Sequence, residues 1–329
     1  MHTARWDSSV ALDGLRVGII GTGSSAIQTV PTIVNQVAHL TLFQRTAQWV
    51  MPQDNPAYSE EERASFRDDP STAAALHDEI SELFANGFSN AVVDADSELL
   101  HKIEETCRLN LEESVTDPVL REQLRPDYRA ACKRLVISPN FYEGIQKTNA
   151  SLVTETITEV EANGVRTADG QYHELDVLIV ATGFQVDRFL RPIDVVNPDG
   201  LHLSEAWAQR PNAYLSVAVP GFPNLFMLNG PNGPVGNFSL IEVAELQFAY
   251  FAQLIELLRS GEAEALSPTF EATKAFEGER VEQAKKTVWA TGCRSWYLDD
   301  RGIPAAWPWT FQKFRDAMTQ PDLAHYQKK

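Results

Sequence analysis

The sequence is poor in cysteine and has no pattern of metal ligands. Its three cysteines, Cys107, Cys132 and Cys293, form no CxxC pair. We therefore interpret them as separate reduced thiols and expect neither disulfide chemistry nor a cysteine zinc site. The seven histidines are scattered, without an HExxH pair, which argues against a catalytic metal.

Basic residues and long apolar runs are also scarce. Lys and Arg number 28 against 45 Asp and Glu, giving a formal net charge of −17. This balance argues against a nucleic-acid partner, whose phosphates need a basic face. No apolar run reaches the roughly 18 residues of a membrane helix, and the first residues lack the apolar core of a signal peptide. We expect a cytoplasmic protein with no membrane partner.

The first part of the chain predicts a parallel βαβ unit. An apolar run from Leu15 to Ile20 is typical of a strand. A glycine-rich turn follows, and then a helix from about Ser24 with Ile27, Val30 and Val34 on one face. Residues 39–43 predict a second strand. This order is the opening of a parallel α/β sheet.

The turn has the pattern G-x-G-x-x-A, with Gly21, Gly23 and Ala26. Between a strand and a helix, this pattern predicts a dinucleotide site. Gly21 allows the tight turn, Gly23 lets a pyrophosphate approach the backbone, and Ala26 permits close packing of helix on strand. The helix amino terminus then offers free N–H groups to the phosphates. The alternative is an ordinary glycine-rich turn.

The end of the second strand indicates which dinucleotide binds. NAD sites usually have a carboxylate there, about 20 residues after the first glycine. This chain has Gln44-Arg45-Thr46 instead. Arginine suits the extra phosphate of NADP because it makes bidentate contacts, so we predict NADPH. The alternative is that Arg45 is a solvated surface residue.

The remainder predicts a helical insertion followed by further strands. Residues 58–129 have helical periodicity, and we expect Pro118 and Pro126 to cap this helical insertion. Turns at Asn163-Gly164 and Asp169-Gly170 predict hairpins, and residues 176–183 predict a central parallel strand. Further on, we expect a buried strand over 224–228 and a loop over 229–234. A long helix capped by Ser239 should follow, with Ile241, Phe248, Ile255 and Leu258 on one stripe, and then a second helix over about 271–289.

Several short motifs occur in an order that resembles one family. They are the HTARWD at residues 2–7, GTGSSAIQ, FQRTAQWVMP, the CKR at 132–134, VATGF, GFPNLFMLNGPNG and the CRSWY at 293–297. The chain resembles FAD-dependent Baeyer–Villiger monooxygenases of the flavin-containing monooxygenase superfamily, in the branch similar to 4-hydroxyacetophenone monooxygenase. The first motif looks like the end of the family fingerprint, with His2 and Trp6 in the linker between domains.

The resemblance implies FAD and NADP as cofactors. It also implies that one oxygen atom from O2 is inserted into a ketone or aldehyde through a flavin peroxide, giving an ester or lactone. Arg134 would be catalytic, supplying a fixed positive charge beside that peroxide. Lys133 would join Arg45 at the NADP phosphate, and Trp296 would contact the nicotinamide. The residues predicted to bind cofactor are Gly21, Thr22, Gly23, Ser24, Ser25, Gln28, Arg45, Thr46, Lys133 and Trp296. Without the family, Lys133 and Arg134 would be interpreted as a solvated pair.

The chain departs from the family in one respect, because no second G-x-G-x-x-G turn for FAD occurs in it. We expect a Rossmann-like NADP-binding domain over 1–52 and 133–180, a helical insertion over 53–132, and the C-terminal part of an FAD-binding domain over 181–329. The absent segment leaves three explanations: truncation, a partner chain that carries it, or a remnant that binds NADPH without oxygenase activity. The chain purified alone should be colourless. A nitrogen- or sulfur-oxidising monooxygenase is a further alternative.

Overall fold

The chain forms two compact units, each built from several stretches of sequence. The computed structural model describes residues 1–53 and 55–329. The first unit comprises Met1–Ala57, Lys102–Ala130 and Leu135–Phe184, and the second comprises Tyr58–His101, Ala131–Arg134 and Gln185–Lys329. The residues of the predicted insertion, 53–132, divide between the two units. The division into three functional domains stays a prediction.

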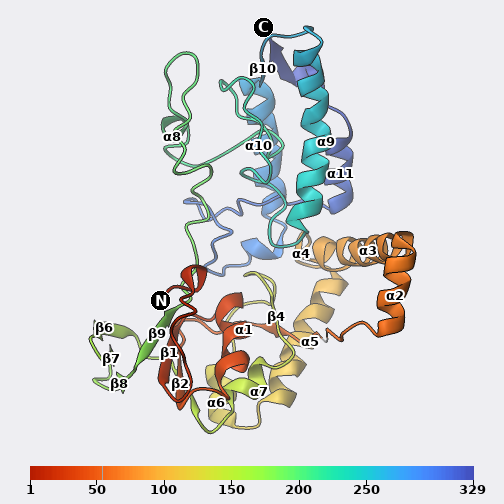
Figure 1. Ribbon diagram of the computed structural model, residues 1–329. Coiled ribbons are helices and arrows are strands. Elements are labelled where there is room, and N and C mark those ends of the chain that lie inside the picture. Colours follow the sequence, from red (N-terminus) through yellow and green to blue (C-terminus); the bar gives the residue numbers. More distant parts are fainter. Residues whose placement is uncertain (54) are drawn as a thin grey trace. The chain divides into compact units, whose positions relative to one another are not determined.

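The first unit contains a parallel sheet with helices and a small antiparallel sheet (Figure 1). Its elements are η1 (Thr3–Arg5), β1 (Arg16–Ile20), α1 (Ser24–Ile33), β2 (His39–Phe43), β3 (Val50–Met51), α6 (Pro118–Gln123), β4 (Val136–Ile137), α7 (Phe141–Ile145), β5 (Ala150–Val153), β6 (Ile157–Glu161), β7 (Gly164–Thr167), β8 (Tyr172–Glu174) and β9 (Val177–Val180), with most of α5 (Glu98–Ser114).

The parallel sheet confirms the predicted α/β class. Its strand order is β5-β2-β1-β9, and β1 pairs with β2 in parallel from Arg16 opposite His39 to Ile20 opposite Phe43. Helix α1 buries Ile27 and Val30 against a core that also contains Ile19 and Leu42. The carboxyl ends of the strands, where α/β proteins bind ligands, therefore lie next to the glycine-rich turn.

The strand after the hairpins lies at an edge of the sheet, which corrects one prediction. Strand β9 pairs with β1 on one side. On its other side the contact is an isolated parallel bridge between His2 and Val180, so β9 is not central. The His2 ring also contacts Phe184, at 5.6 Å between centroids, whereas Trp6 is exposed. The predicted hairpins are confirmed, because β6, β7 and β8 form an antiparallel sheet.

The second unit is mainly helical. Its elements are α2 (Glu60–Asp68), α3 (Pro70–Phe84), the π-helical η2 (Ala85–Ser89), α4 (Asn90–Val92), α8 (Leu203–Ala206), α9 (Leu240–Arg259), β10 (Leu266–Pro268), α10 (Phe270–Ala284), η3 (Val288–Ala290), α11 (Phe311–Thr319), η4 (Leu323–His325) and β11 (Tyr326–Lys328), with the first residues of α5. Across the described part of the chain, no helix has the length and apolar character needed to span a bilayer.

Helix α9 begins as predicted but buries a different face. The Ser239 hydroxyl accepts from the N–H of Glu242 and caps the helix. The buried side is formed by Val243, Tyr250 and Leu254, whereas Ile241 is 75% exposed and Phe248 is 58% exposed. The predicted stripe is therefore wrong. The helix is apolar on more than one face, and periodicity does not show which face meets the core.

The predicted buried strand over 224–228 does not form. The described segment makes an isolated antiparallel bridge between Ala218 and Phe226, and the Met227 N–H donates to the Val217 carbonyl at 2.8 Å. Asn224 has a positive φ of 59°, which interrupts an extended run. A short apolar run contains the residue types of a strand but does not show that a neighbouring strand is present to pair with it.

Candidate nucleotide-binding site

The glycine-rich turn is shaped by a backbone conformation that requires glycine at Gly21. Its φ is +112°, and a Cβ there would overlap the carbonyl oxygen of Ala181 and lie 3.0 Å from its carbonyl carbon. The Gly21 N–H donates to the Phe43 carbonyl at 3.1 Å. This close approach joins β1, β2 and the end of β9, so Gly21 has a structural role in the turn.

Gly23 occupies a different environment two residues later. It is the N-cap of α1, with ordinary extended backbone, and no side chain caps the helix. The first turn of α1 also contains no acidic residue, so neither a capping side chain nor a carboxylate of this turn offsets its free N–H groups and partial positive charge. A Cβ on Gly23 would meet nothing within 4 Å. The space in front of the turn is therefore open, as a bound phosphate requires.

The residues around Arg45 are held in place by hydrogen bonds. The Thr22 hydroxyl donates to the Thr46 carbonyl at 2.6 Å, which ties the glycine-rich turn to the end of β2. The Gln44 side chain is buried and donates to the Gln123 carbonyl at 2.6 Å. Arg45 itself is exposed. Its backbone is fixed at the carboxyl end of β2 while its guanidinium is accessible.

The first unit thus brings most of the predicted cofactor residues together. Gly21, Thr22, Gly23, Ser24, Ser25 and Gln28 occupy the turn and the first part of α1, with Arg45 and Thr46 after β2. Ser25 and Gln28 are exposed, and Ser24 is half-buried. Lys133, Arg134 and Trp296 belong to the second unit. Their approach to the first group stays a prediction.

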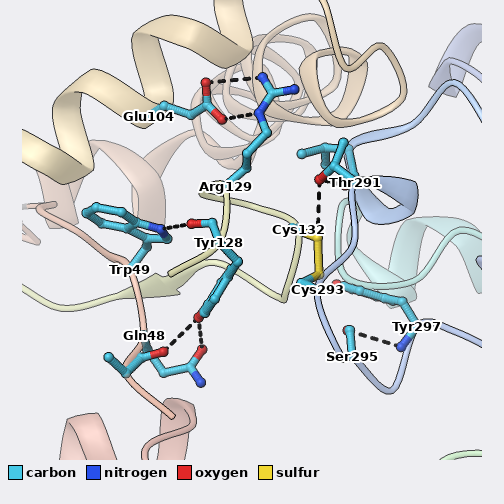
Figure 2. Close-up of a disulfide and its surroundings, with 12 residues drawn as sticks. Gln48, Trp49, Glu104, Tyr128, Arg129, Cys132, Thr291, Cys293, Ser295 and Tyr297 are labelled. Atoms are coloured by element: carbon cyan, nitrogen blue, oxygen red, sulfur yellow. Dashed lines mark hydrogen bonds and ion pairs between the residues drawn. A yellow bond between two sulfur atoms is a disulfide. The ribbon is translucent and has the colours of Figure 1, made fainter. Parts of the chain in front are cut away.

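The second unit contains a disulfide, which corrects the expectation of three separate thiols. Cys132 is bonded to Cys293, with 6.2 Å between their Cα atoms and a sequence separation of 161. Figure 2 shows this bond beside Thr291, whose hydroxyl donates to the Cys132 sulfur at 3.5 Å. No local motif indicates this pair, because tertiary structure brings together two cysteines that are 161 residues apart. Cys107 is the free, buried cysteine.

The disulfide lies next to the predicted catalytic arginine. Arg134 is exposed and Lys133 is half-buried. Tyr297 is 2% exposed, and its burial raises the pKa of the phenol, while the positive charge of Arg134 opposes that rise. Trp296 is 43% exposed and stacks on Tyr297 at 4.2 Å between centroids. Sequence reasoning passed over Tyr297, although it follows Trp296 in the same motif.

Tyr297 also contacts the loop that follows residue 228. A Cβ on Gly236 would overlap the Tyr297 hydroxyl, so the phenol packs directly on the Gly236 backbone. The next residue, Asn237, is fully buried, and neither its side-chain oxygen nor its nitrogen has a hydrogen-bond partner among the described residues. Its carbonyl accepts from Ser89, the last residue of the π-helical segment. Such segments are frequent at functional sites.

Ser216 supports the same loop through a hydrogen bond and a close contact. The Ser216 hydroxyl donates to the Gly230 carbonyl at 2.6 Å, and a side chain at Gly233 would overlap that hydroxyl. Ser216 and Asn232 have positive φ values of 65° and 66°, and the Asn232 side-chain oxygen has no partner among the described residues. Left-handed non-glycine residues and unpaired buried amides both cost free energy. Together they are typical of a ligand-binding loop.

The parallel sheet, the glycine-rich turn and the uncapped α1 are the features of an α/β fold of the dinucleotide-binding type. No family model matches the chain. It is 42% identical over 316 residues to an uncharacterized monooxygenase of Mycobacterium tuberculosis, covering 95% of this chain and 63% of that protein. It is 39% identical over 332 residues to a Baeyer–Villiger monooxygenase of Streptomyces coelicolor, covering 99% and 63%.

Solved structures agree with these relatives. A cyclohexanone monooxygenase from Rhodococcus sp. Phi1 bound to NADP+ matches with a TM-score of 0.84 and 27% identity, over 100% of this chain and 70% of that chain. OTEMO in complex with FAD and NADP matches with a TM-score of 0.86 and 25% identity, over 100% and 70%. Over the region it spans, the chain is similar in sequence and in structure to Baeyer–Villiger-type flavin monooxygenases. It spans about 63% of the length of the curated relatives.

Proposed function

We propose that the whole protein is an NADPH- and FAD-dependent monooxygenase that inserts one oxygen atom from O2 into a ketone or aldehyde, giving an ester or lactone. The observation that carries the proposal is the glycine-rich turn. Gly23 opens onto free space at the uncapped, acid-free start of α1, with Arg45 exposed at the end of β2. Similarity to Baeyer–Villiger monooxygenases along nearly the whole chain supports the same class.

Arg45 favours NADPH over NADH. A guanidinium at this strand end can make two charge-assisted hydrogen bonds to the ribose phosphate that distinguishes NADP. The hydrogen bond from the Thr22 hydroxyl to the Thr46 carbonyl fixes the backbone next to Arg45. The position of Arg45 is therefore defined although its side chain is exposed. We assign Lys133 to the same phosphate and Trp296 to the nicotinamide end of the cofactor.

The loop from Asn229 to Asn237 fits the polar part of a bound flavin. Bound FAD would supply the activation of O2. The amide of Asn237 and the side-chain oxygen of Asn232 lack partners among the described residues, and leaving each such group unpaired costs about 1–3 kcal/mol. A ligand with hydrogen-bond donors and acceptors on its rim would recover that cost. These residues would therefore hold and orient the flavin rather than react themselves.

Arg134 is the residue that we assign to charge stabilisation. Arginine stays protonated at all relevant pH values, and its charge acts on the buried Tyr297, whose environment is water-poor. In such surroundings a fixed positive charge stabilises a developing anion more than it does in water.

Three further proposals accompany this function. The substrate is a small carbonyl compound, the protein is cytoplasmic and, as an alternative, a partner chain supplies a further FAD-binding segment.

The cofactor assignment is tested by Arg45→Ala. Loss of a bidentate charged contact costs about 1.5–3 kcal/mol, so KM for NADPH should rise about 10- to 150-fold while KM for NADH stays nearly constant. The matched control is Arg166→Ala. Arg166 pairs with Glu161 on the hairpin sheet, and its removal should alter neither constant. Equal effects of Arg45→Ala on both cofactors would contradict the assignment.

The reaction class requires a separate measurement. NADPH oxidation by the FAD-supplied protein should depend on added ketone, with ester or lactone formed in proportion. Oxidation of amines or sulfides in place of ketones would assign the protein to the nitrogen- and sulfur-oxidising branch. NADPH binding without any oxygenated product would reduce the function to nucleotide binding.

A further inference from the structure

A four-residue segment with the predicted catalytic arginine belongs to the second unit, although the residues on both sides belong to the first. This segment is Ala131–Arg134, between Ala130 and Leu135. Cys132, at its centre, is bonded to Cys293. The covalent bond, drawn in Figure 2, is therefore made within the short segment that the chain contributes to the second unit here.

Both cysteines follow a residue in the left-handed region. Ala131 has φ of 63°, and Gly292 has φ of 102°. Glycine adopts this region freely, but alanine does so at a cost, so its conformation persists where the surroundings impose it. Ala131 is buried, at 3% exposure. The backbone before Cys132 is thus held by its tertiary environment, and the disulfide is the covalent part of that environment.

The disulfide also joins the two segments that contain Arg134 and Tyr297. Arg134 is two residues after Cys132, and Tyr297 is four residues after Cys293. The Tyr297 N–H donates to the Ser295 hydroxyl at 3.2 Å, which fixes the backbone of the second segment locally, between Cys293 and Tyr297. The charge of Arg134 acts on Tyr297, and the disulfide covalently links the two segments that contain these side chains.

We propose that the Cys132–Cys293 disulfide is a redox-sensitive clamp that positions Arg134 beside Tyr297. Cys132 and Cys293 are positioning residues. A dithiol would open the clamp: the S–S bond breaks, each sulfur becomes a thiol, two electrons and two protons are taken up, and the dithiol is oxidised to its own disulfide. With the clamp open, the segments Ala131–Arg134 and Thr291–Tyr297 should loosen together.

The first test counts thiols and measures hydrogen exchange in the full chain. Alkylation after denaturation should label one cysteine in the untreated protein and three after treatment with dithiothreitol. Exchange in both segments should rise at least tenfold after reduction and in Cys132→Ser or Cys293→Ser. Cys107→Ser is the matched control, because Cys107 is unpaired and burial raises the pKa of its thiol to about 12. It should change exchange in neither segment.

Three labelled cysteines without reductant would overturn the proposal, as would unchanged exchange after complete reduction. The effect on turnover rests on the proposed function and is measured separately. Reduction should lower kcat for ketone oxidation about tenfold, and it should raise KM for NADPH because the loosened segments also contain Lys133 and Trp296. It should have no effect on a variant with both cysteines replaced. If exchange responds as expected but no oxygenated product ever forms, the clamp stands and the proposed function fails.

Discussion

Two glycines of the same turn should respond oppositely to replacement by alanine. Gly21 has φ of +112°, and a Cβ there would overlap the Ala181 carbonyl oxygen, whereas a Cβ on Gly23 would meet nothing within 4 Å. Gly21→Ala should therefore destabilise the fold. Gly23→Ala should leave the fold intact and fill the space that we assign to the pyrophosphate.

The magnitudes follow from the backbone and the contacts. Placing a side chain in the left-handed region costs about 1–2 kcal/mol, and overlap with a rigid backbone atom adds about 1–3 kcal/mol. Gly21→Ala should thus lower the free energy of unfolding by about 2–5 kcal/mol. At Gly23, alanine is a poorer N-cap than glycine, but it loses less chain entropy on folding, about 0.4–1 kcal/mol. The net change should stay within about 1 kcal/mol.

Urea unfolding followed by circular dichroism measures the stability of both variants, and calorimetry measures their NADP+ binding. Gly23→Ala should weaken binding at least tenfold, which corresponds to about 1.4 kcal/mol. If Gly23→Ala binds NADP+ as tightly as the original chain, the open space is not the phosphate site and the reasoning fails. If Gly21→Ala is as stable as the original chain, the turn geometry described above is wrong.

Three further outcomes are expected elsewhere in the molecule. Gly236→Ala should displace the Tyr297 hydroxyl, giving a shifted tyrosine absorption titration and at least tenfold weaker flavin binding. Removing the disulfide through Cys132→Ser opens a loop of 161 residues and should lower the free energy of unfolding by about 5 kcal/mol in the chain-entropy treatment. Asp176 accepts hydrogen bonds from Arg16, which lowers its pKa from 3.8 to about 2. Its contribution to stability should be complete above pH 3.8 and disappear as the pH falls through about 2.

Each of these has its own control. Gly278→Ala on α10 meets open space and should leave flavin binding unchanged. Cys107→Ser shows how much the free energy of unfolding changes when a thiol is removed and the disulfide remains. Asp176→Asn should remove the part of the pH-dependent stability that comes from Asp176. Acid unfolding curves that coincide for this variant and the original chain would show that the Arg16 pair contributes nothing.

The sequence was informative where structure is decided locally. A strand, a glycine pattern and a helix follow one another within twenty residues, and each is specified by its own residue types. The same holds for Arg45 directly after β2 and for the Ser239 cap of α9. Capping, turn conformation and apolar periodicity involve residues only a few positions apart, so the amino-acid sequence shows them directly.

Tertiary structure alone decided the features that join distant segments. Three features depend on contact with a segment that is distant in the sequence, so no local pattern predicts them. They are the bond between Cys132 and Cys293, the edge position of β9 and the buried face of α9. Helix α9 is apolar on two faces, and its composition is compatible with burying either one. The physical reason is that residue type determines how favourable burial of a side chain is. Which positions are buried depends on the surface that packs against the helix or strand, and the whole chain forms that surface.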